Sequence, residues 1–265
     1  MQDNPLLSQL GKDEVREKVR SRYAEIAKTE CSCCSSPSAS SLGNAEVSAK
    51  LGYSEEEMNA VPESSNMGLG CGNPQAIAAL KAGEVVVDLG SGGGFDCFLA
   101  AARVGASGKV IGVDMTPEMI SKARKNAVEN KYENVEFRLG EIEYLPIPDN
   151  TADAIMSNCV INLSPDKPQV YREAWRILKP GGRIAISDVV AIKELPSEMK
   201  SSFGALSGCI SGAETVPDIE RILGAAGFRN IQIAVNEASG NFIKDWVPGS
   251  GAENYIRSSI ITAIK

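Results

Sequence analysis

Cysteine is the residue type of this sequence with the greatest capacity for chemistry. The 265 residues contain no histidine and seven cysteines, namely Cys31, Cys33, Cys34, Cys71, Cys97, Cys159 and Cys209. Without histidine the chain cannot build a Ser-His-Asp triad, a Cys-His dyad, a His-ligated zinc site or a histidine-ligated haem. We therefore expect thiol chemistry, with carboxylate, lysine or tyrosine side chains left for any acid–base work.

Charge and hydropathy predict the compartment and exclude some partners. The formal net charge is -7 and the pI is about 4.9, which argues against nucleic acid or an anionic membrane as a partner. The first residues lack the features of a signal peptide, and no apolar run is long enough to span a membrane. The sequence therefore predicts a cytoplasmic protein. In that reducing compartment, metal, metalloid or redox chemistry is favoured over a disulfide scaffold.

A glycine-rich turn is the next feature that could bind a ligand. The run Val85-Val-Val-Asp-Leu-Gly-Ser-Gly-Gly-Gly94 predicts a buried strand that leads through glycines into a helix, so backbone amides face the ligand. The spacing does not fit the dinucleotide fingerprint, and a carboxylate at Asp88 would repel a pyrophosphate. Asp88 suits an ammonium group, and Asp114, at the end of the next strand, can accept hydrogen bonds from ribose hydroxyls.

These features together predict S-adenosylmethionine as the cofactor. The expected contacts of the turn are Asp88, Gly90, Gly92 and Asp114. After the third strand, Glu141 and Ile142 could flank the adenine ring, and a solvated loop carboxylate is the alternative for Glu141. For the turn itself, the alternative is a tight strand–helix connection without a ligand.

The order of the predicted elements indicates an α/β fold with a doubly wound, mostly parallel, Rossmann-like sheet, because strands and helices alternate. An amphipathic helix over residues 13–27 precedes this part. Asn73 and Pro74 predict the start of a short helix that ends at Gly83. The predicted strands are 85–89, 109–114, 135–139, 152–158, 183–190, 230–235 and 255–264, and the other predicted helices are 95–104, 116–130, 167–178 and 217–226.

Three regions follow from this pattern. Residues 1–72 form an N-terminal helix followed by a Ser-rich, cysteine-containing segment (31–41) that we expect to be mobile without a ligand. We expect residues 73–190 to form the domain that binds S-adenosylmethionine. Residues 191–265 form an α+β extension that caps the site and completes the sheet.

Several motifs resemble those of arsenite methyltransferases that use S-adenosylmethionine. The resemblance covers about residues 15–215 and is specific, because cysteines lie inside the motifs. It implies the class I S-adenosylmethionine methyltransferase fold. The motifs are Ser65-Asn-Met-Gly-Leu-Gly-Cys-Gly-Asn-Pro74, Asp88-Leu-Gly-Ser-Gly-Gly-Gly-Phe-Asp-Cys-Phe98, Val113-Asp-Met-Thr116, Ser157-Asn-Cys-Val-Ile-Asn-Leu163 and Cys209-Ile-Ser-Gly-Ala213.

The resemblance also implies roles for the thiols. Cys159 and Cys209 match the two arsenic(III)-binding cysteines of the family, and Cys71 matches a third thiol that the first methylation needs. A further N-terminal cysteine of the family matches Cys31, Cys33 or Cys34, among which the sequence does not choose; Cys34 is included with the catalytic candidates. Met115 and Asn158, inside the motifs, join the expected cofactor contacts. The implied substrate is arsenite or its thiol conjugates, and the implied reductant is thioredoxin or glutathione.

The expected chemistry is consistent with the absence of histidine. A soft thiolate at Cys159, just past the fourth strand, selects a soft partner such as trivalent arsenic. The lone pair of thiolate-bound arsenic attacks a methyl carbon without a general base, and alignment alone supplies roughly 7–11 kcal/mol. Methylation formally raises arsenic to the pentavalent state. Two cysteines that close to a disulfide could reduce it again and complete a cycle, with Cys71 and an N-terminal thiol as candidates. Cys97 is expected to be a small buried hydrophobe.

Two other functions stay open on sequence grounds. The first is a C- or O-methyltransferase for a small apolar acceptor such as a quinone precursor, which would need an acid or base and a broad apolar pocket near Cys159. The second is a non-catalytic, thiol-based metalloid-binding protein. The glycine turn with Asp88 and Asp114 argues against the second alternative, because a protein that only binds has no need of a cofactor site.

Overall fold

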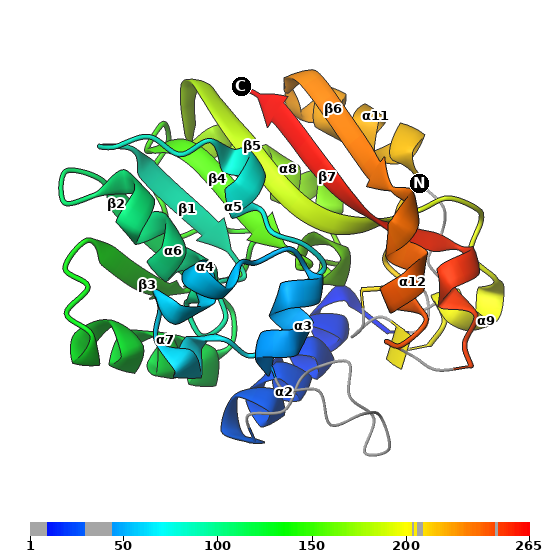
Figure 1. Ribbon diagram of the computed structural model, residues 1–265. Helices are drawn as coiled ribbons and strands as arrows, with labels where there is room; N and C mark the ends of the chain where they lie inside the picture. The colour runs from blue at the N-terminus through cyan, green and yellow to red at the C-terminus, as the bar shows by residue number, and fades with distance from the viewer. Residues whose placement is uncertain (1–9, 30–43, 203, 206–208, 247–248) are drawn as a thin grey trace.

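The computed structural model describes residues 10–29, 44–202, 204–205, 209–246 and 249–265 (Figure 1). Cys31, Cys33 and Cys34, and with them the expectation of a mobile Ser-rich segment, lie outside the described residues. The other four cysteines lie within the described residues, so the model tests how the fold positions them.

One sheet of seven strands runs through the molecule in the order β3-β2-β1-β4-β5-β7-β6. The first five strands in this order pair in parallel, and β7 pairs antiparallel with both β5 and β6. This is the predicted doubly wound, mostly parallel sheet. The strands are β1 (Val85–Leu89), β2 (Lys109–Asp114), β3 (Val135–Leu139), β4 (Ala152–Asn158), β5 (Leu178–Ala191), β6 (Arg229–Asn236) and β7 (Ile256–Ile264).

Helices cover both faces of the sheet and its carboxyl edge, as Figure 1 shows. The α-helices are α2 (Lys12–Thr29), α3 (Asn44–Lys50), α4 (Glu55–Asn59), α5 (Gln75–Ala78), α6 (Phe95–Val104), α7 (Pro117–Glu129), α8 (Lys167–Ile177), α9 (Ser197–Lys200), α11 (Val216–Ala226) and α12 (Gly240–Ile243). The short 3-10 turns are η1 (Glu63–Ser65), η2 (Ile161–Leu163), η3 (Glu237–Ser239) and η4 (Ala252–Asn254). Within the described ranges, none of the helices is both long and apolar enough to cross a membrane.

Side-chain alternation along the strands builds a core on each face of the sheet. Val87 of β1 packs in one apolar cluster with residues of α8 and α11. Its neighbour Val86 packs in a second cluster with residues of α6 and α7, including Phe98. Because both faces are buried, these strands are nearly continuous apolar runs, which explains why their ranges could be predicted from sequence.

Most predicted elements are confirmed to within two residues at each end, and two boundaries differ by five residues. The helix expected to end at Gly83 ends at Ala78, because Ala79 adopts the left-handed conformation with φ 44 and ψ 49. Strand β5 begins at Leu178, five residues before the predicted start, with a register irregularity against β4 between Ala152 and Ala154. The irregularity accommodates the extra residues of β5 between Leu178 and Arg183, which include Pro180-Gly-Gly182.

Helix α2 closes the carboxyl edge of the sheet. Val15 and Val19 pack in an apolar cluster that also contains Cys71, Cys159 and Cys209. About two turns further on, Ile26 packs on Met67 and Met119. The predicted N-terminal helix therefore exists, and its apolar stripe covers the functional end of the sheet. The regional boundaries at residues 72 and 190 stay a prediction, because β5 and β7 join both regions in one sheet.

Replacement of Phe98 by alanine tests the core beneath the site. The Phe98 side chain is fully buried, and its ring lies 4.5 Å from the Tyr132 ring and 5.8 Å from the Phe137 ring. We expect Phe98→Ala to lower the free energy of unfolding by about 3–5 kcal/mol, as measured by urea denaturation. Val128→Ala, at a position that is 79% exposed, should change it by less than about 0.5 kcal/mol; similar losses in both variants would contradict this core.

Candidate functional site

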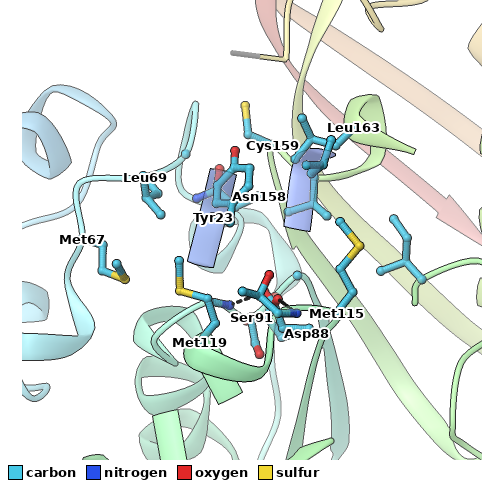
Figure 2. Close-up of a pocket in the computed structure, with 18 of the residues that line it drawn as sticks. Tyr23, Met67, Leu69, Asp88, Ser91, Met115, Met119, Asn158, Cys159 and Leu163 are labelled. Carbon is cyan, nitrogen blue, oxygen red and sulfur yellow. Dashed lines mark hydrogen bonds between the residues drawn. The ribbon is translucent and has the colours of Figure 1, made fainter. Parts of the chain in front are cut away.

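The largest concentration of predicted functional residues lies in one pocket at the carboxyl ends of β1, β2 and β4. Figure 2 shows Asp88, Ser91, Met115, Asn158 and Cys159 around it. Helix α2 contributes Arg16, Val19 and Tyr23 to the lining. Of the expected cofactor contacts, the pocket brings together Asp88, Gly90, Gly92, Asp114, Met115, Ile142 and Asn158.

The glycine turn after β1 is fixed by backbone geometry. Gly90 and Gly92 have φ of +73 and +51, and a Cβ at Gly90 would lie 2.3 Å from the Val160 side chain. Glycine is therefore required at Gly90 for both conformation and space. The Gly92 amide donates to the Asp114 carboxylate at 3.0 Å, so the end of β2 and the turn after β1 hold each other. This is the loop-and-carboxylate arrangement that the sequence predicted.

Buried carboxylates give the pocket an electrostatic preference for cations. Asp88 and Asp96 are 3% and 8% exposed. Burial raises the pKa of Asp88 well above its usual value, and the nearby Asp96 raises it further. Burial also raises the pKa of Asp96 to about 6, although hydrogen bonds from Tyr53 and Asn158 oppose the shift. A cationic ligand would relieve this desolvation cost, because it favours the ionised form of each acid.

Asp96 and its hydrogen-bond partner Tyr53 are candidate functional residues that the sequence did not single out. The Tyr53 hydroxyl donates to Asp96 at 2.8 Å, and Asp96 lines the pocket beside Asp88. A signal for Asp96 existed, since an acidic residue stood in the first turn of an otherwise apolar helix. Tyr53 carried none, because its contact joins segments 43 residues apart.

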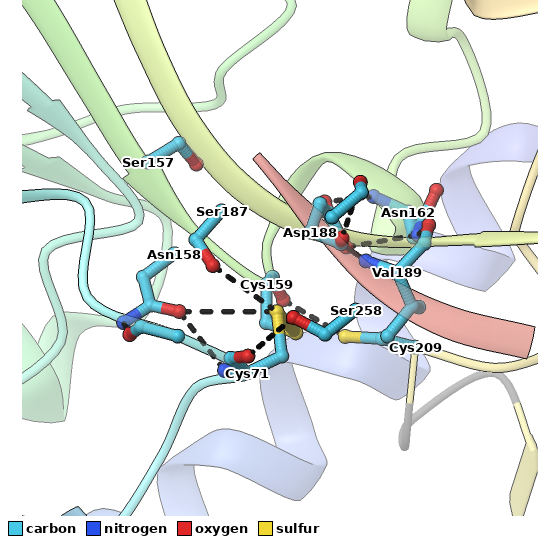
Figure 3. The surroundings of a disulfide bond; sticks show 12 residues. Cys71, Ser157, Asn158, Cys159, Asn162, Ser187, Asp188, Val189, Cys209 and Ser258 are labelled. Atoms are coloured by element: carbon cyan, nitrogen blue, oxygen red, sulfur yellow. Dashed lines mark hydrogen bonds between the residues drawn. A yellow bond between two sulfur atoms is a disulfide. The ribbon is translucent and has the colours of Figure 1, made fainter. Parts of the chain in front are cut away.

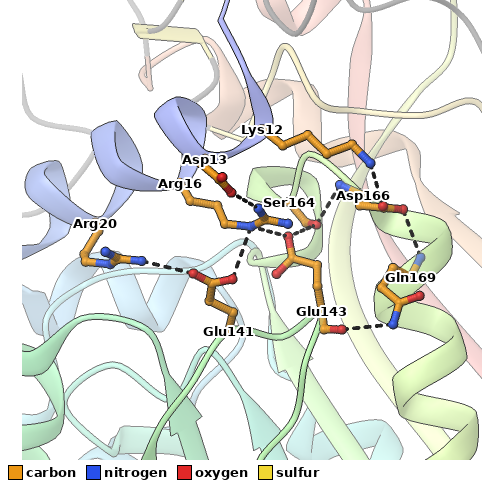
Figure 4. A network of polar contacts seen from close by, with 9 residues as sticks. All are labelled: Lys12, Asp13, Arg16, Arg20, Glu141, Glu143, Ser164, Asp166 and Gln169. Atoms are coloured by element: carbon orange, nitrogen blue, oxygen red, sulfur yellow. Dashed lines mark hydrogen bonds and ion pairs between the residues drawn. The ribbon is translucent and has the colours of Figure 1, made fainter.

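The structure places Glu141, the expected adenine contact, outside the pocket lining and places Glu143, for which no role was expected, in it. Glu141 was predicted to face the adenine, but among the described residues that line the pocket are Ile142 and Glu143, and not Glu141. Figure 4 shows Glu141 turned to α2, where Arg20 donates to it at 3.1 Å. Glu143 is 3% exposed and accepts a hydrogen bond from Ser164 at 2.6 Å. The sequence could not choose between them, because the turn after Gly140 decides which side chain points inward.

Three of the cysteines meet at one side of this pocket (Figure 3). Cys71 and Cys159 form a disulfide with a Cα–Cα distance of 5.7 Å. The Cys209 thiol donates to the Cys159 carbonyl oxygen at 2.8 Å. Cys159 and Cys209 line the pocket, and all three side chains are buried. The fold therefore brings together sulfur atoms from positions far apart in the sequence.

The disulfide differs from the pairing expected from sequence. Free thiols were expected, and an N-terminal thiol was the candidate partner for Cys71. In the structure Cys71 pairs with Cys159, the cysteine predicted to bind arsenic. The predicted partners lie outside the described residues, so the structure does not test them. The pairing shows that the Cys71 loop brings its sulfur within bonding distance of the Cys159 sulfur.

Two of these cysteines have a strained backbone conformation. Cys159 and Cys209 have φ of 56 and 60, in the left-handed region that residues other than glycine seldom occupy. Such conformations cost of order 1–3 kcal/mol and persist where the surroundings fix them. At Cys159, the backbone amide donates to the Ser187 carbonyl oxygen of β5 at 2.8 Å. The strained backbone aims both side chains at the same pocket wall.

Asp188 is a buried acid beside the thiols that the sequence reasoning also missed. One of its carboxylate oxygens lies within 4.8 Å of the sulfurs of Cys71 and Cys159. Burial raises its pKa to about 6, and Asn162 donates to it at 2.8 Å. Because Asn162 belongs to the turn after Cys159, the carboxylate anchors that turn. The signal available in the sequence was one charged residue inside an apolar strand.

Cys97 is buried, as predicted, and it also has a polar contact. Its side chain is fully buried on α6 among apolar neighbours. The thiol donates to Asp88 at 3.2 Å, and burial raises its pKa well above the usual value. Cys97 therefore stays a neutral thiol that donates to Asp88, and it is separate from the other three cysteines of the described residues.

Comparisons with known proteins agree with this geometry. Residues 80–227 match the family described as "Methyltransferase domain". The chain is 47% identical over 262 residues to an arsenite methyltransferase of Halobacterium salinarum, covering 96% of this chain and 67% of that protein. It is 35% identical over 232 residues to an arsenite methyltransferase of Mus musculus, covering 82% of this chain and 58% of that protein.

Solved structures give the same result. An arsenic(III) S-adenosylmethionine methyltransferase from Chlamydomonas reinhardtii superposes with a TM-score of 0.61 at 35% identity, covering 82% of this chain and 72% of that chain. A phosphoethanolamine N-methyltransferase of Haemonchus contortus gives 0.64 at 16% identity, covering 92% of this chain and 60% of that chain, and shares the fold alone. This chain spans about half to two thirds of the curated relatives' length. On these grounds, the chain belongs to the family of S-adenosylmethionine-dependent arsenite methyltransferases.

Proposed function

We propose that this protein transfers methyl groups from S-adenosylmethionine to trivalent arsenic held by Cys159 and Cys209, with Cys71 as the third thiol. The observation that carries the proposal is the meeting of these cysteines at the wall of a pocket whose floor is acidic. Thiolates select a soft metalloid, and buried carboxylates select a cation. A soft metalloid substrate and a cationic methyl donor would therefore bind next to each other in this pocket.

The pocket residues suit the cofactor. Asp88 and Asp96 offer carboxylates for an ammonium group, and Asp114 lies beside the glycine turn, where a ribose would be held. The Ser91 hydroxyl is buried and has no hydrogen-bond partner within the described part of the chain, so it fits a polar ligand group. When bound, the cofactor supplies an electrophilic methyl group on a sulfonium. Asn158 and Met115 contribute the wall between this region and the thiols.

The chain's own residues then have a limited task. Cys159 and Cys209 hold the arsenic with its lone pair directed into the pocket, and α2 covers the site and excludes water with Val19 and Tyr23. No residue is needed as a general base, because the attacking lone pair carries no proton. Alignment is the main contribution of the protein.

The Cys71–Cys159 disulfide belongs to the oxidised form of this enzyme. Two electrons from a thiol reductant, with thioredoxin and glutathione as candidates, convert it to two thiols that can bind arsenic. Arsenite or its thiol conjugate is the expected substrate of that reduced form. A reducing compartment such as the cytoplasm suits this chemistry, because the thiols must be regenerated after each oxidation.

The two rival functions receive less support from the site. A C- or O-methyltransferase needs an acid or base at the acceptor, whereas the acceptor side holds Cys159 and Cys209. A protein that only binds arsenic needs no acidic cofactor pocket. Incubation of the protein with arsenite, S-adenosylmethionine and a thiol reductant, followed by arsenic speciation, separates the three. Methylated arsenic supports the proposal; arsenic bound but unchanged, or neither binding nor turnover, contradicts it.

Serine substitutions test the roles of the thiols. We expect Cys159→Ser and Cys209→Ser each to abolish methylation of arsenite and of methylarsenite, because each removes a soft ligand, while cofactor affinity in a titration stays the same. Cys71→Ser should lose chiefly the first methylation. Cys97→Ser is the matched control, since its hydroxyl can still donate to Asp88, and it should keep its activity. A Cys159→Ser enzyme that methylates arsenite at the parent rate would refute the arrangement.

Asp114 is tested by cofactor affinity. Asp114→Ala removes the carboxylate that holds the glycine turn and faces the ribose, so we expect a loss of roughly 3 kcal/mol, which is about a 100-fold rise in the Kd of S-adenosylmethionine. Isothermal titration calorimetry measures the change. Asp149→Ala, whose exposed carboxylate binds Arg176, is the control. Equal affinities for the Asp114 variant and the parent would remove Asp114 from the cofactor site.

The raised pKa of Asp96 predicts a pH dependence for cofactor binding. Below pH 6 Asp96 is protonated in the free protein, and it must lose this proton to face a cation. The Kd should therefore fall as the pH rises, by about tenfold between pH 5 and pH 7 for one group of pKa about 6. Asp96→Asn should remove this tenfold contribution, and any dependence that remains belongs to Asp88, whose pKa burial also raises. A Kd that is constant, or that rises over this range, would contradict the role of the acidic floor.

A further inference from the structure

The peptide of Cys71 is held by side chains that come from two different strands. The Ser258 hydroxyl of β7 donates to the Cys71 carbonyl oxygen at 2.7 Å. The Asn158 side chain, at the end of β4, accepts from the Cys71 amide at 3.0 Å and donates to the Gly72 carbonyl oxygen at 2.8 Å. Figure 3 shows this clamp beside the disulfide. Side chains thus supply the hydrogen-bond partners that a helix or strand would provide for the backbone of this loop.

Ser258 is itself rigidly placed. It is 6% exposed, it lies opposite Val189 in the antiparallel pairing of β5 and β7, and its amide donates to the fully buried Ser239 hydroxyl at 2.9 Å. It is not among the described residues that line the cofactor pocket. Its hydroxyl can therefore act on Cys71 without touching either the cofactor or the arsenic site.

The loop that carries Cys71 fits closely against this framework. A Cβ at Gly72 would lie 2.2 Å from the Ser187 hydroxyl and 3.9 Å from the Ser258 hydroxyl. A Cβ at Gly70 would lie 2.7 Å from the Asn158 amide. The Cys71 sulfur lies 3.9 Å from the Ser187 hydroxyl, next to Cys159. Because the glycines leave no space, the clamp fixes the position of the sulfur as well as of the backbone.

We propose that Ser258 is a positioning residue for Cys71: its hydrogen bond keeps the Cys71 thiol beside Cys159 and so sets the balance between their disulfide and dithiol forms. In the exchange, the disulfide takes up two electrons and two protons from two glutathione molecules, which leave as one glutathione disulfide. A hydroxyl that holds Cys71 in place raises the effective concentration of its thiol and shifts the balance toward the disulfide. The consequence for methylation rests on the proposed function; the redox balance does not.

The test equilibrates the full chain in buffers of defined glutathione to glutathione disulfide ratio and counts alkylated Cys71 and Cys159 by mass spectrometry. Loss of one neutral hydrogen bond predicts an equilibrium constant for disulfide formation about fivefold lower in Ser258→Ala. Ser259→Ala is the matched control: it removes a buried hydroxyl from the next position of β7, whose partner is the Asp188 carbonyl oxygen. It should stay within about twofold of the parent.

Ser258→Thr and Ser258→Val test the role of the hydroxyl even if the alanine variant fails to fold. Ser258→Thr and Ser258→Val have nearly the same shape and differ in the hydroxyl, so the threonine form should favour the disulfide about fivefold more. Equal constants for this pair, or an equal shift in Ser259→Ala and Ser258→Ala, would overturn the proposal.

Methylation assays add an independent measurement. With excess thiol reductant, which keeps Cys71 and Cys159 as thiols, Ser258→Ala should slow the methylation of arsenite about fivefold, because the Cys71 thiol is no longer held beside Cys159. Methylarsenite methylation and cofactor Kd should stay unchanged. An equal loss with both substrates would indicate a general structural defect and contradict the positioning role. If the parent protein itself does not methylate arsenite, the proposed function fails, whereas the redox measurement still decides the role of Ser258.

Discussion

Parallel pairing of β4 with β1 and β5 is the constraint on which this site depends. The register places Asp88 opposite Met156 and Asn158 opposite Ser187, so the Asp88 carboxylate, the Asn158 side chain and Cys159 all lie at the carboxyl edge of the sheet. Cys159 follows directly, with its amide bonded to β5. A slip of one residue in β4 would turn Asn158 to the opposite face of the sheet and separate these groups.

Charge and softness divide the pocket between two ligands. On one side, buried acids with raised pKa values make ionisation costly until a cation arrives. On the other side, buried sulfurs lie among apolar side chains of α2 and of the residues near β7. Each side would be unfavourable for the other's ligand, since a cation gains little from an apolar wall and a soft metalloid gains little from carboxylates. This division would orient the methyl donor toward the arsenic without an acid–base residue.

The sequence was sufficient for the parts of the structure that depend on local patterns. Strands β1 to β4 and the glycine turn were predicted to the residue, because apolar runs and closely spaced glycines are visible in the sequence itself. Contacts between distant segments were not predictable: Tyr53 on Asp96, Ser258 on Cys71, and the choice of Glu143 over Glu141 depend on how loops fold back. The Cys71–Cys159 pairing was missed for the same reason, since spacing alone does not determine which thiols meet.

The central claim is that arsenic is held by thiols from distant segments at the wall of the methyl-donor pocket. Arsenic K-edge X-ray absorption of the fully reduced protein loaded with one equivalent of arsenite tests it most directly. The account predicts an arsenic centre surrounded by sulfur, with sulfur ligands lost when Cys159 or Cys209 is replaced by serine. Oxygen-only coordination in the parent protein, or sulfur coordination that is unchanged by both substitutions, would contradict it.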